Sequence, residues 1–298
     1  MRLFFFLLLF SPVLIAEPVR VITSVLPLKT FVEKIGGNHV DVKSLVRPGY
    51  NPHTYDLSPR QIMAVSKAHM FVRTGVPFED AWMERIRSAN TKMLVIDVRD
   101  GMDLLELAMP EELPEEVQKD HDGHSHHHTH KHTHHAGEID PHIWTDPIRV
   151  KQLADNILKA LVKIDAENEK TYRANHAEFI QQINLLDKEI RQYLAEVKNR
   201  KFLVFHPAWG YFANQYGLEQ VAIEFQGKEP GAKTIAGVIS LAREDGIRVI
   251  FVQPQFDQRL AKKVADAIEG RVIVVDPLSA DYIENMLTVA SQFGRVLQ

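Results

Sequence analysis

A histidine-rich tract is the segment of the chain whose residue types most clearly indicate metal binding. Nine of the fifteen histidines lie within residues 121–135, in the segment HDGHSHHHTHKHTHH. Neutral imidazole is a ligand for zinc, copper and nickel, and a segment without helix or strand periodicity can offer several combinations of nitrogens. We therefore expect a weak auxiliary metal site, formed by His121, His124, His126, His127, His128, His130, His132, His134 and His135.

The surroundings of this tract argue against two simpler interpretations. A solvated linker would not need so many histidines, and an engineered tag would not be internal or interrupted by Thr, Ser, Lys and Asp. An acidic run precedes the tract and is typical of a surface linker. We therefore interpret residues 111–138 as one acidic, histidine-rich loop.

Three further histidines and one aspartate occupy positions suited to a preformed metal site. His53 and His142 lie in NPHTYDLSP and DPHIWTDP, whereas His206 and Asp276 directly follow the apolar runs FLVF and VIVV. Each of these histidines has a proline beside it, which restricts the backbone and reduces the entropy lost when the side chain is held for a ligand.

Taken singly, each of these residues has an ordinary explanation as a turn or capping residue. Together, three nitrogens and one carboxylate oxygen at about 2.0–2.2 Å form a tetrahedral zinc site with no vacant position. The sequence thus predicts His53, His142, His206 and Asp276 as metal ligands, with Zn²⁺ favoured and Mn²⁺ less favoured. The remaining histidines, His39, His69 and His176, lack such placement, and we expect them to be surface or structural residues.

The elements that must position these ligands alternate between strand and helix. Such alternation predicts an α/β fold with parallel sheets flanked by helices, and ligands of such sheets bind beyond the carboxyl ends of the strands. Two similar lobes are expected. Predicted strands cover 19–25, 39–46, 70–74 and 93–98 in the first half, and 201–205, 220–225, 247–253 and 271–276 in the second.

A long helical segment separates the two halves. Residues 148–199 contain neither glycine nor proline and carry two apolar stripes at helical spacing. A coiled-coil oligomer is the alternative, but each stripe is short. We therefore predict a long, rigid, continuous connecting helix at 148–199, between an N-terminal metal-binding lobe at 17–147 and a C-terminal metal-binding lobe at 200–298.

The beginning of the chain indicates export. Arg2 is followed by an apolar run that is too short for an ordinary membrane span and ends at Ala16, so residues 1–16 are predicted to be a cleavable signal peptide. The absence of cysteine excludes both a disulfide and a lipid attached to cysteine. We expect a periplasmic protein, and the formal net charge of −4 does not favour nucleic acid as a partner.

An ordered set of segments resembles a known family. NPHTYDLSP, DPHIWTDP, FHPAWGYFANQYG, EPGAKTIAGVISLARE, FVQPQF and VVDPLSADYIENM are similar to successive segments of the zinc- and manganese-binding solute-binding proteins of bacterial ABC importers. The resemblance covers nearly the whole mature chain. It is strongest to the zinc-specific, ZnuA-like branch, which also carries an acidic, histidine-rich insertion before the segment that corresponds to DPHIW.

The resemblance implies a function and a set of partners. His53, His142 and His206 match the family's three histidine ligands, and Asp276 matches its carboxylate ligand. The implied protein is a monomer that captures Zn²⁺ in the periplasm and delivers the ion to an ABC permease in the inner membrane. Many members of the zinc branch have a disulfide in the second lobe, which this chain cannot form.

Two other functions compete with zinc import. A zinc hydrolase would need an open coordination position and a carboxylate as general base, but the sequence has no HExxH motif, and Glu224 and Glu229 are interpreted as loop residues. A periplasmic zinc buffer or chaperone would have the same fold and site. We therefore expect a binding protein that is not an enzyme.

Overall fold

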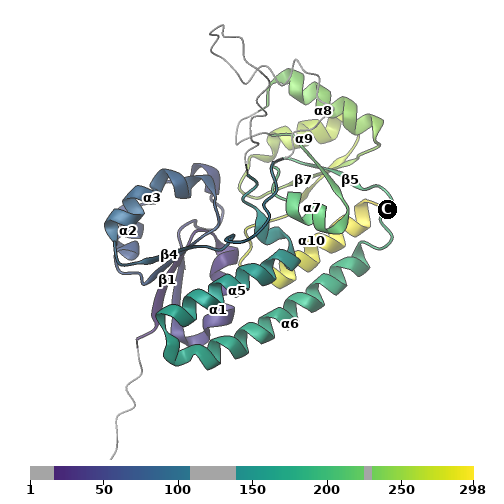
Figure 1. Ribbon diagram of the computed structural model, residues 1–298. Helices are drawn as coiled ribbons and strands as arrows, with labels where there is room; N and C mark the ends of the chain where they lie inside the picture. The colour runs from purple at the N-terminus through teal and green to yellow at the C-terminus, as the bar shows by residue number, and fades with distance from the viewer. Residues whose placement is uncertain (1–16, 108–138, 225–229) are drawn as a thin grey trace, which may run out of the picture.

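Two α/β lobes joined by helices make up the protein (Figure 1). The computed structural model describes residues 17–107, 139–224 and 230–298, so the predicted signal peptide and the acidic, histidine-rich loop lie outside the described residues. Each lobe contains a parallel four-stranded sheet, which confirms the predicted fold class. The strand order is β2-β1-β3-β4 in the first sheet and β6-β5-β7-β8 in the second.

The strands coincide closely with the predicted apolar runs because buried parallel strands favour continuous β-branched and aliphatic residues. The bounds are β1 Val19–Thr23, β2 Val40–Ser44, β3 Met70–Arg73, β4 Leu94–Asp97, β5 Lys201–Val204, β6 Glu219–Ala222, β7 Val249–Val252 and β8 Arg271–Val274.

Helices follow the strands in both lobes, and several begin with clear local signals. Proline occupies the first turn of the first three helices, and Ser58 and Gln61 form a reciprocal capping box at the start of the second. The bounds are α1 Leu26–Gly36, α2 Pro59–Val65, α3 Pro77–Ala89, α7 Gly210–Tyr216, α8 Ala232–Glu244, α9 Gln258–Ala267 and α10 Tyr282–Val296.

The connection between the lobes contains a long helix, but the prediction of one continuous helix over 148–199 was wrong. The segment forms two helices, α5 (Pro147–Ile164) and α6 (Glu169–Tyr193), which lie side by side in Figure 1. Asp165 leaves the helical conformation between them and accepts hydrogen bonds from the side chains of Asn168 and Tyr172. Such local bonds compete with helix continuation, so the chain reverses without glycine or proline.

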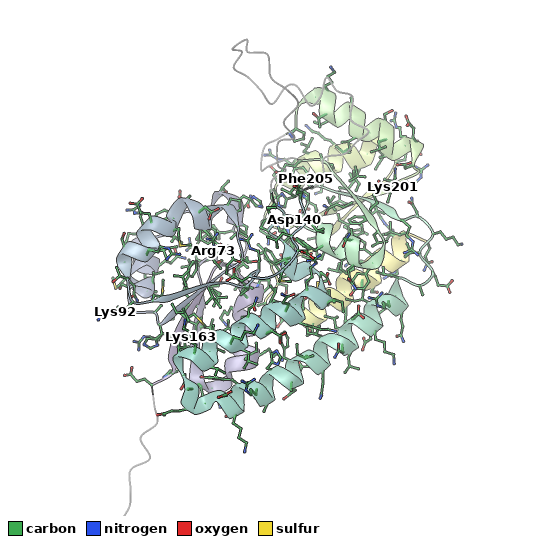
Figure 2. The ribbon with its side chains drawn as sticks, viewed as in Figure 1. Arg73, Lys92, Asp140, Lys163, Lys201 and Phe205 are labelled. Carbon is green, nitrogen blue, oxygen red and sulfur yellow. The ribbon has the colours of Figure 1, made fainter. Side chains whose placement is uncertain are left out.

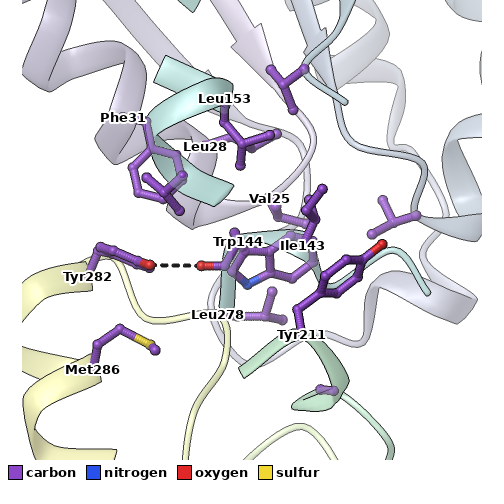
Figure 3. Packing of buried hydrophobic residues seen from close by; sticks show 14 of the residues in the cluster. Val25, Leu28, Phe31, Ile143, Trp144, Leu153, Tyr211, Leu278, Tyr282 and Met286 are labelled. Atoms are coloured by element: carbon purple, nitrogen blue, oxygen red, sulfur yellow. Dashed lines mark hydrogen bonds between the residues drawn. The ribbon is translucent and has the colours of Figure 1, made fainter. Parts of the chain in front are cut away.

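A large apolar core extends through both lobes and the connecting helices, and a second, smaller core lies within the second lobe. Its central part contains Trp144, whose indole donates to the carbonyl oxygen of Pro277 at 2.7 Å and whose own carbonyl accepts from the hydroxyl of Tyr282 at 2.9 Å (Figure 3). Helix α6 contacts both α1 of the first lobe and α10 of the second. The lobes are therefore joined by dense packing, which opposes a wide swing between them.

Among the described residues, no helix has the length and apolar character needed to cross a membrane.

Candidate metal site

The three histidines predicted from the strand ends come together in the structure. One ligating atom from each of His53, His142 and His206 lies within 4.8 Å of the others, and the described residues contain no other such group of histidine, aspartate or glutamate side chains. The ring centroids are separated by 5.7 Å for His53 and His142, 4.7 Å for His53 and His206, and 5.2 Å for His142 and His206. The group thus unites residues from both lobes.

His53 belongs to a short 3-10 helix, Pro52–Thr54, on the first lobe. The side chain of Asn51 accepts a hydrogen bond from the backbone N–H of His53 at 2.8 Å, so the turn is capped at its start. This turn packs against α3, and the ring of Tyr55 contacts that of Phe78 on α3. The Nε2 atom of His53 is buried and has no hydrogen-bond partner, which leaves it free to bind a ligand.

His142 is held by Asp140, a residue that sequence reasoning missed. Oδ1 of Asp140 accepts from the backbone N–H of His142 at 2.9 Å and from the ring Nδ1 at 2.7 Å. Both side chains are buried, at the junction of the two lobes where Figure 2 labels Asp140. The edge of Trp144 supports the same ring, with centroids 5.4 Å apart. Sequence reasoning could have found Asp140 because it lies two residues before His142 in the DPH segment.

His206 follows β5, next to the point in the second sheet where the strand order reverses, as expected for a ligand site of a parallel sheet. Its Nδ1 lies 2.9 Å from Oε2 of Glu224, and Phe256 stacks on its ring with centroids 4.8 Å apart. Glu224 lies in a bend just beyond β6, as interpreted, but sequence reasoning missed that it is only 2% exposed and contacts His206. Glu229, interpreted in the same way, lies outside the described residues.

The two carboxylates determine which ring nitrogens can bind a metal. A carboxylate only accepts hydrogen bonds, so Nδ1 of His142 and Nδ1 of His206 each carry the proton and leave Nε2 with a lone pair. These two Nε2 atoms lie 3.4 Å apart. Two nitrogens at 2.0–2.1 Å from a tetrahedral zinc ion would be roughly 3.3–3.4 Å apart. The pair therefore has the spacing of zinc ligands, with the orienting carboxylates typical of such sites.

Burial keeps two of these imidazoles neutral. Burial away from water, together with the neighbouring rings of His206 and His142, lowers the pKa of His53 from 6.5 to about 2. Burial also lowers the pKa of His206, although the hydrogen bond with Glu224 acts in the opposite direction. Because only a neutral imidazole can ligate a metal, these shifts favour metal binding at neutral pH.

Asp276, the fourth predicted ligand, is not part of the three-histidine group. Its Oδ1 accepts from the side chain of Gln255 at 2.8 Å and from the backbone N–H of Leu278 at 2.9 Å. The residue lines a cavity of about 200 Å³ together with Arg47 and Gly49, so it faces the first lobe. The nine histidines predicted as an auxiliary site, within 121–135, lie outside the described residues.

The other three histidines have structural contacts elsewhere, as expected. Nδ1 of His69 accepts from the backbone N–H of Arg20, His39 contacts the ring of Tyr172 edge-on, and Nε2 of His176 lies 2.8 Å from a carboxylate oxygen of Asp155. None of them is near the three-histidine group as a potential ligand.

A bound metal should be released by acid, below the ordinary histidine pKa. In the unfolded chain His53 takes up a proton as the pH falls through about 6.5, whereas in the folded protein it stays neutral down to about pH 2. The unfolded state thus binds more protons in this window, so the metal-free protein should lose stability as the pH falls below about 6.5. Bound zinc should therefore still be retained at pH 6.5 and be lost at lower pH.

This release is measured by dialysing the zinc-loaded protein at stepwise lower pH and assaying the retained zinc, with thermal unfolding of the metal-free protein recorded in parallel. Zinc lost at a pH where the metal-free protein is still as stable as at neutral pH would contradict this link between protonation of His53 and metal release.

Comparisons with known proteins identify the family of this chain. Residues 21–295 match the family model of ZnuA, described as the periplasmic component A of a zinc-uptake complex. The chain is 30% identical over 268 residues to the zinc-binding protein AdcA of Streptococcus pyogenes serotype M3, covering 89% of this chain and 52% of AdcA. It thus spans about half of the length of that relative. It is also 30% identical over 263 residues to the high-affinity zinc uptake system protein ZnuA of Bacillus subtilis, covering 86% of this chain and 76% of that protein.

Solved structures of ZnuA have a fold similar to that of this chain. A crystal structure of ZnuA has a TM-score of 0.82 and 34% sequence identity, and the alignment covers 95% of this chain and 100% of that one. A deletion mutant of ZnuA with zinc bound has the same TM-score and identity, with 95% and 99% of the two chains covered.

Proposed function

Because the chain belongs to the ZnuA family of periplasmic zinc-uptake components, we propose that it captures Zn²⁺ between its two lobes and delivers the ion to an ABC permease of the inner membrane. The observation that carries this proposal is the convergence of His53, His142 and His206, whose ligating atoms lie within 4.8 Å of one another. Three imidazole nitrogens favour zinc, whereas manganese prefers harder oxygen ligands. The protein acts as a binding component rather than as an enzyme.

We assign the fourth coordination position to Asp276, which would add one carboxylate oxygen. Asp276 lies two residues beyond the carboxyl end of β8, as His206 does beyond that of β5, and it lines the cavity between the lobes. None of the three histidines lines this cavity, so the carboxylate of Asp276 would have to turn from Gln255 toward them when zinc binds. Three nitrogens and one oxygen would complete a closed tetrahedral site.

The test is the metal content of untagged protein purified from the periplasm, with its coordination measured by X-ray absorption. We expect one tightly bound zinc per chain with three nitrogen ligands. A strain that lacks the gene and any second zinc importer should grow poorly under zinc limitation and recover when the gene is restored. Normal growth of the deletion strain would remove the uptake role while leaving a zinc buffer as the function.

We propose that residues 17–147 and 200–298 act as two metal-binding lobes held by the connecting segment 148–199. Since α6 contacts helices of both lobes and one apolar core joins them, metal binding should order the segments around the site without closing the molecule. Small-angle scattering profiles of the metal-free and zinc-bound protein should nearly superimpose, while hydrogen exchange should slow around His53, His142 and Asp276. A large compaction on zinc addition would contradict this rigid arrangement.

The histidine-rich tract should hold zinc only weakly. Deleting residues 120–135 is expected to remove several weakly bound ions and to leave one tight ion, because ordering a tract without a preformed site costs entropy that the packed three-histidine group does not lose. Calorimetric titration of the full and shortened chains measures both classes. Loss of the tight ion together with the tract would place the principal site in the loop and not between the lobes.

A further inference from the structure

The carboxylate of Asp140 is confined on one side by a glycine. Gly210 is the first residue of α7, and a Cβ atom built on it would lie 2.6 Å from Oδ2 of Asp140, closer than real Cβ contacts come. Gly210 is not among the glycines with positive φ, so its backbone would accept any residue. The reason for glycine at this position is therefore the space that Asp140 occupies.

The backbone of Asp140 is connected to α7 through Leu105. Its N–H donates to the carbonyl oxygen of Leu105 at 2.9 Å, and the N–H of Leu105 donates to the hydroxyl of Tyr211 at 2.9 Å. Tyr211 is the neighbour of Gly210 on α7. With its main chain held and its side chain only 2% exposed, Asp140 cannot move its carboxylate aside without breaking a buried contact.

We propose that Gly210 is a positioning residue for the metal site, acting through Asp140 on His142. By leaving space for the Asp140 carboxylate, it fixes the ring whose Nε2 faces that of His206 at 3.4 Å. Displacing the carboxylate would release the Nδ1 hydrogen bond, so the ring could rotate or change its protonated nitrogen. This inference rests on the proposed function in that it assigns His142 to the zinc site.

A double-mutant cycle tests the proposal. Zinc affinity is measured by competition with a chromophoric chelator for the wild type, Gly210→Ala, Asp140→Ala and the double variant. Loss of an orienting carboxylate typically lowers metal affinity by about 10–100-fold, so each single variant should bind zinc about 10–100-fold more weakly. The double variant should be no weaker than Asp140→Ala alone, because the added methyl group then has no carboxylate to displace.

Gly231→Ala is the matched control. Gly231 lies at the start of α8, as Gly210 lies at the start of α7, and has negative φ. A Cβ at Gly231 would meet no atom within 4 Å, so the zinc affinity of this variant should stay at the wild-type value. If the fold-losses in zinc affinity of the two single variants multiplied in the double variant, Gly210 would not act through Asp140. Unchanged affinity of Gly210→Ala would equally overturn the proposal.

A second readout covers the case in which Gly210→Ala folds poorly. Thermal unfolding of the metal-free proteins should then show that Asp140→Ala restores stability to the Gly210→Ala chain; a double variant as unstable as the single one would overturn the steric link. Nitrogen NMR of His142 in metal-free protein reports its protonated nitrogen directly. These measurements need no zinc, so failure of the wild type to bind zinc tightly would remove the proposed function and leave the steric proposal to be judged separately.

Discussion

Zinc affinity is expected to fall by about 100-fold or more when His206 is replaced by alanine. Apparent binding free energies of structural zinc sites are about 10–16 kcal/mol for four ligands, so one ligand accounts for about 2.5–4 kcal/mol. Since 1.4 kcal/mol is tenfold in affinity, this corresponds to roughly 60–700-fold. The alanine variant also leaves the buried carboxylate of Glu224 without its ring partner, which should lower the stability of the folded protein as well.

His206→Glu separates ligand loss from metal preference. A carboxylate in place of the third imidazole makes the site harder and richer in oxygen, so zinc affinity should fall while manganese affinity falls less or increases. His39→Ala is the control, because His39 lies before β2, at the opposite end of the first sheet, and contacts Tyr172. Titrations with both metals provide the measurement. Equal losses for zinc and manganese would show that His206 does not determine the choice of metal.

Replacing Trp144 by alanine should destabilise the protein by about 3–5 kcal/mol, because truncating a buried aromatic ring leaves a cavity. Trp144 is 1% exposed, and its removal also breaks the indole hydrogen bond to Pro277. For a chain of this size such a loss lowers the unfolding temperature by on the order of 10 °C. Differential scanning calorimetry of the metal-free protein measures it.

Two variants test whether this loss comes from the packing around Trp144. Trp144→Phe keeps an aromatic ring but loses the indole donor, so it should cost less than the alanine variant. Trp82→Ala removes a partly buried indole that has Arg85 over its ring. Its loss of stability should be smaller than that of either Trp144 variant. Because the ring of Trp144 also supports His142, Trp144→Ala should weaken zinc binding, whereas Trp82→Ala should not. A Trp144→Ala loss no larger than that of Trp82→Ala would contradict this role.

The amino-acid sequence was sufficient to predict the eight strands and to single out His53, His142 and His206 as candidates for one site. Strand and helix are encoded by the periodicity of neighbouring residues, and parallel strands bring their carboxyl ends to one edge. The same local signals failed at Asp165. One apolar stripe precedes this residue and the other follows it, and the reversal depends on hydrogen bonds from Asn168 and Tyr172 and on packing between the resulting helices.

Only the tertiary structure decided how the histidines are held. Glu224 is 18 residues from His206 and reaches it because β5 and β6 are neighbours, while Oδ1 of Asp276 is engaged by Gln255, 21 residues away. Gly210 leaves space for the carboxylate of Asp140, although the two residues are 70 positions apart in the chain. The sequence by itself therefore determined the fold class and the residue types available for zinc. Packing decided which nitrogens face one another, because side-chain rotamers, proton positions and close contacts depend on neighbours that are distant in the chain.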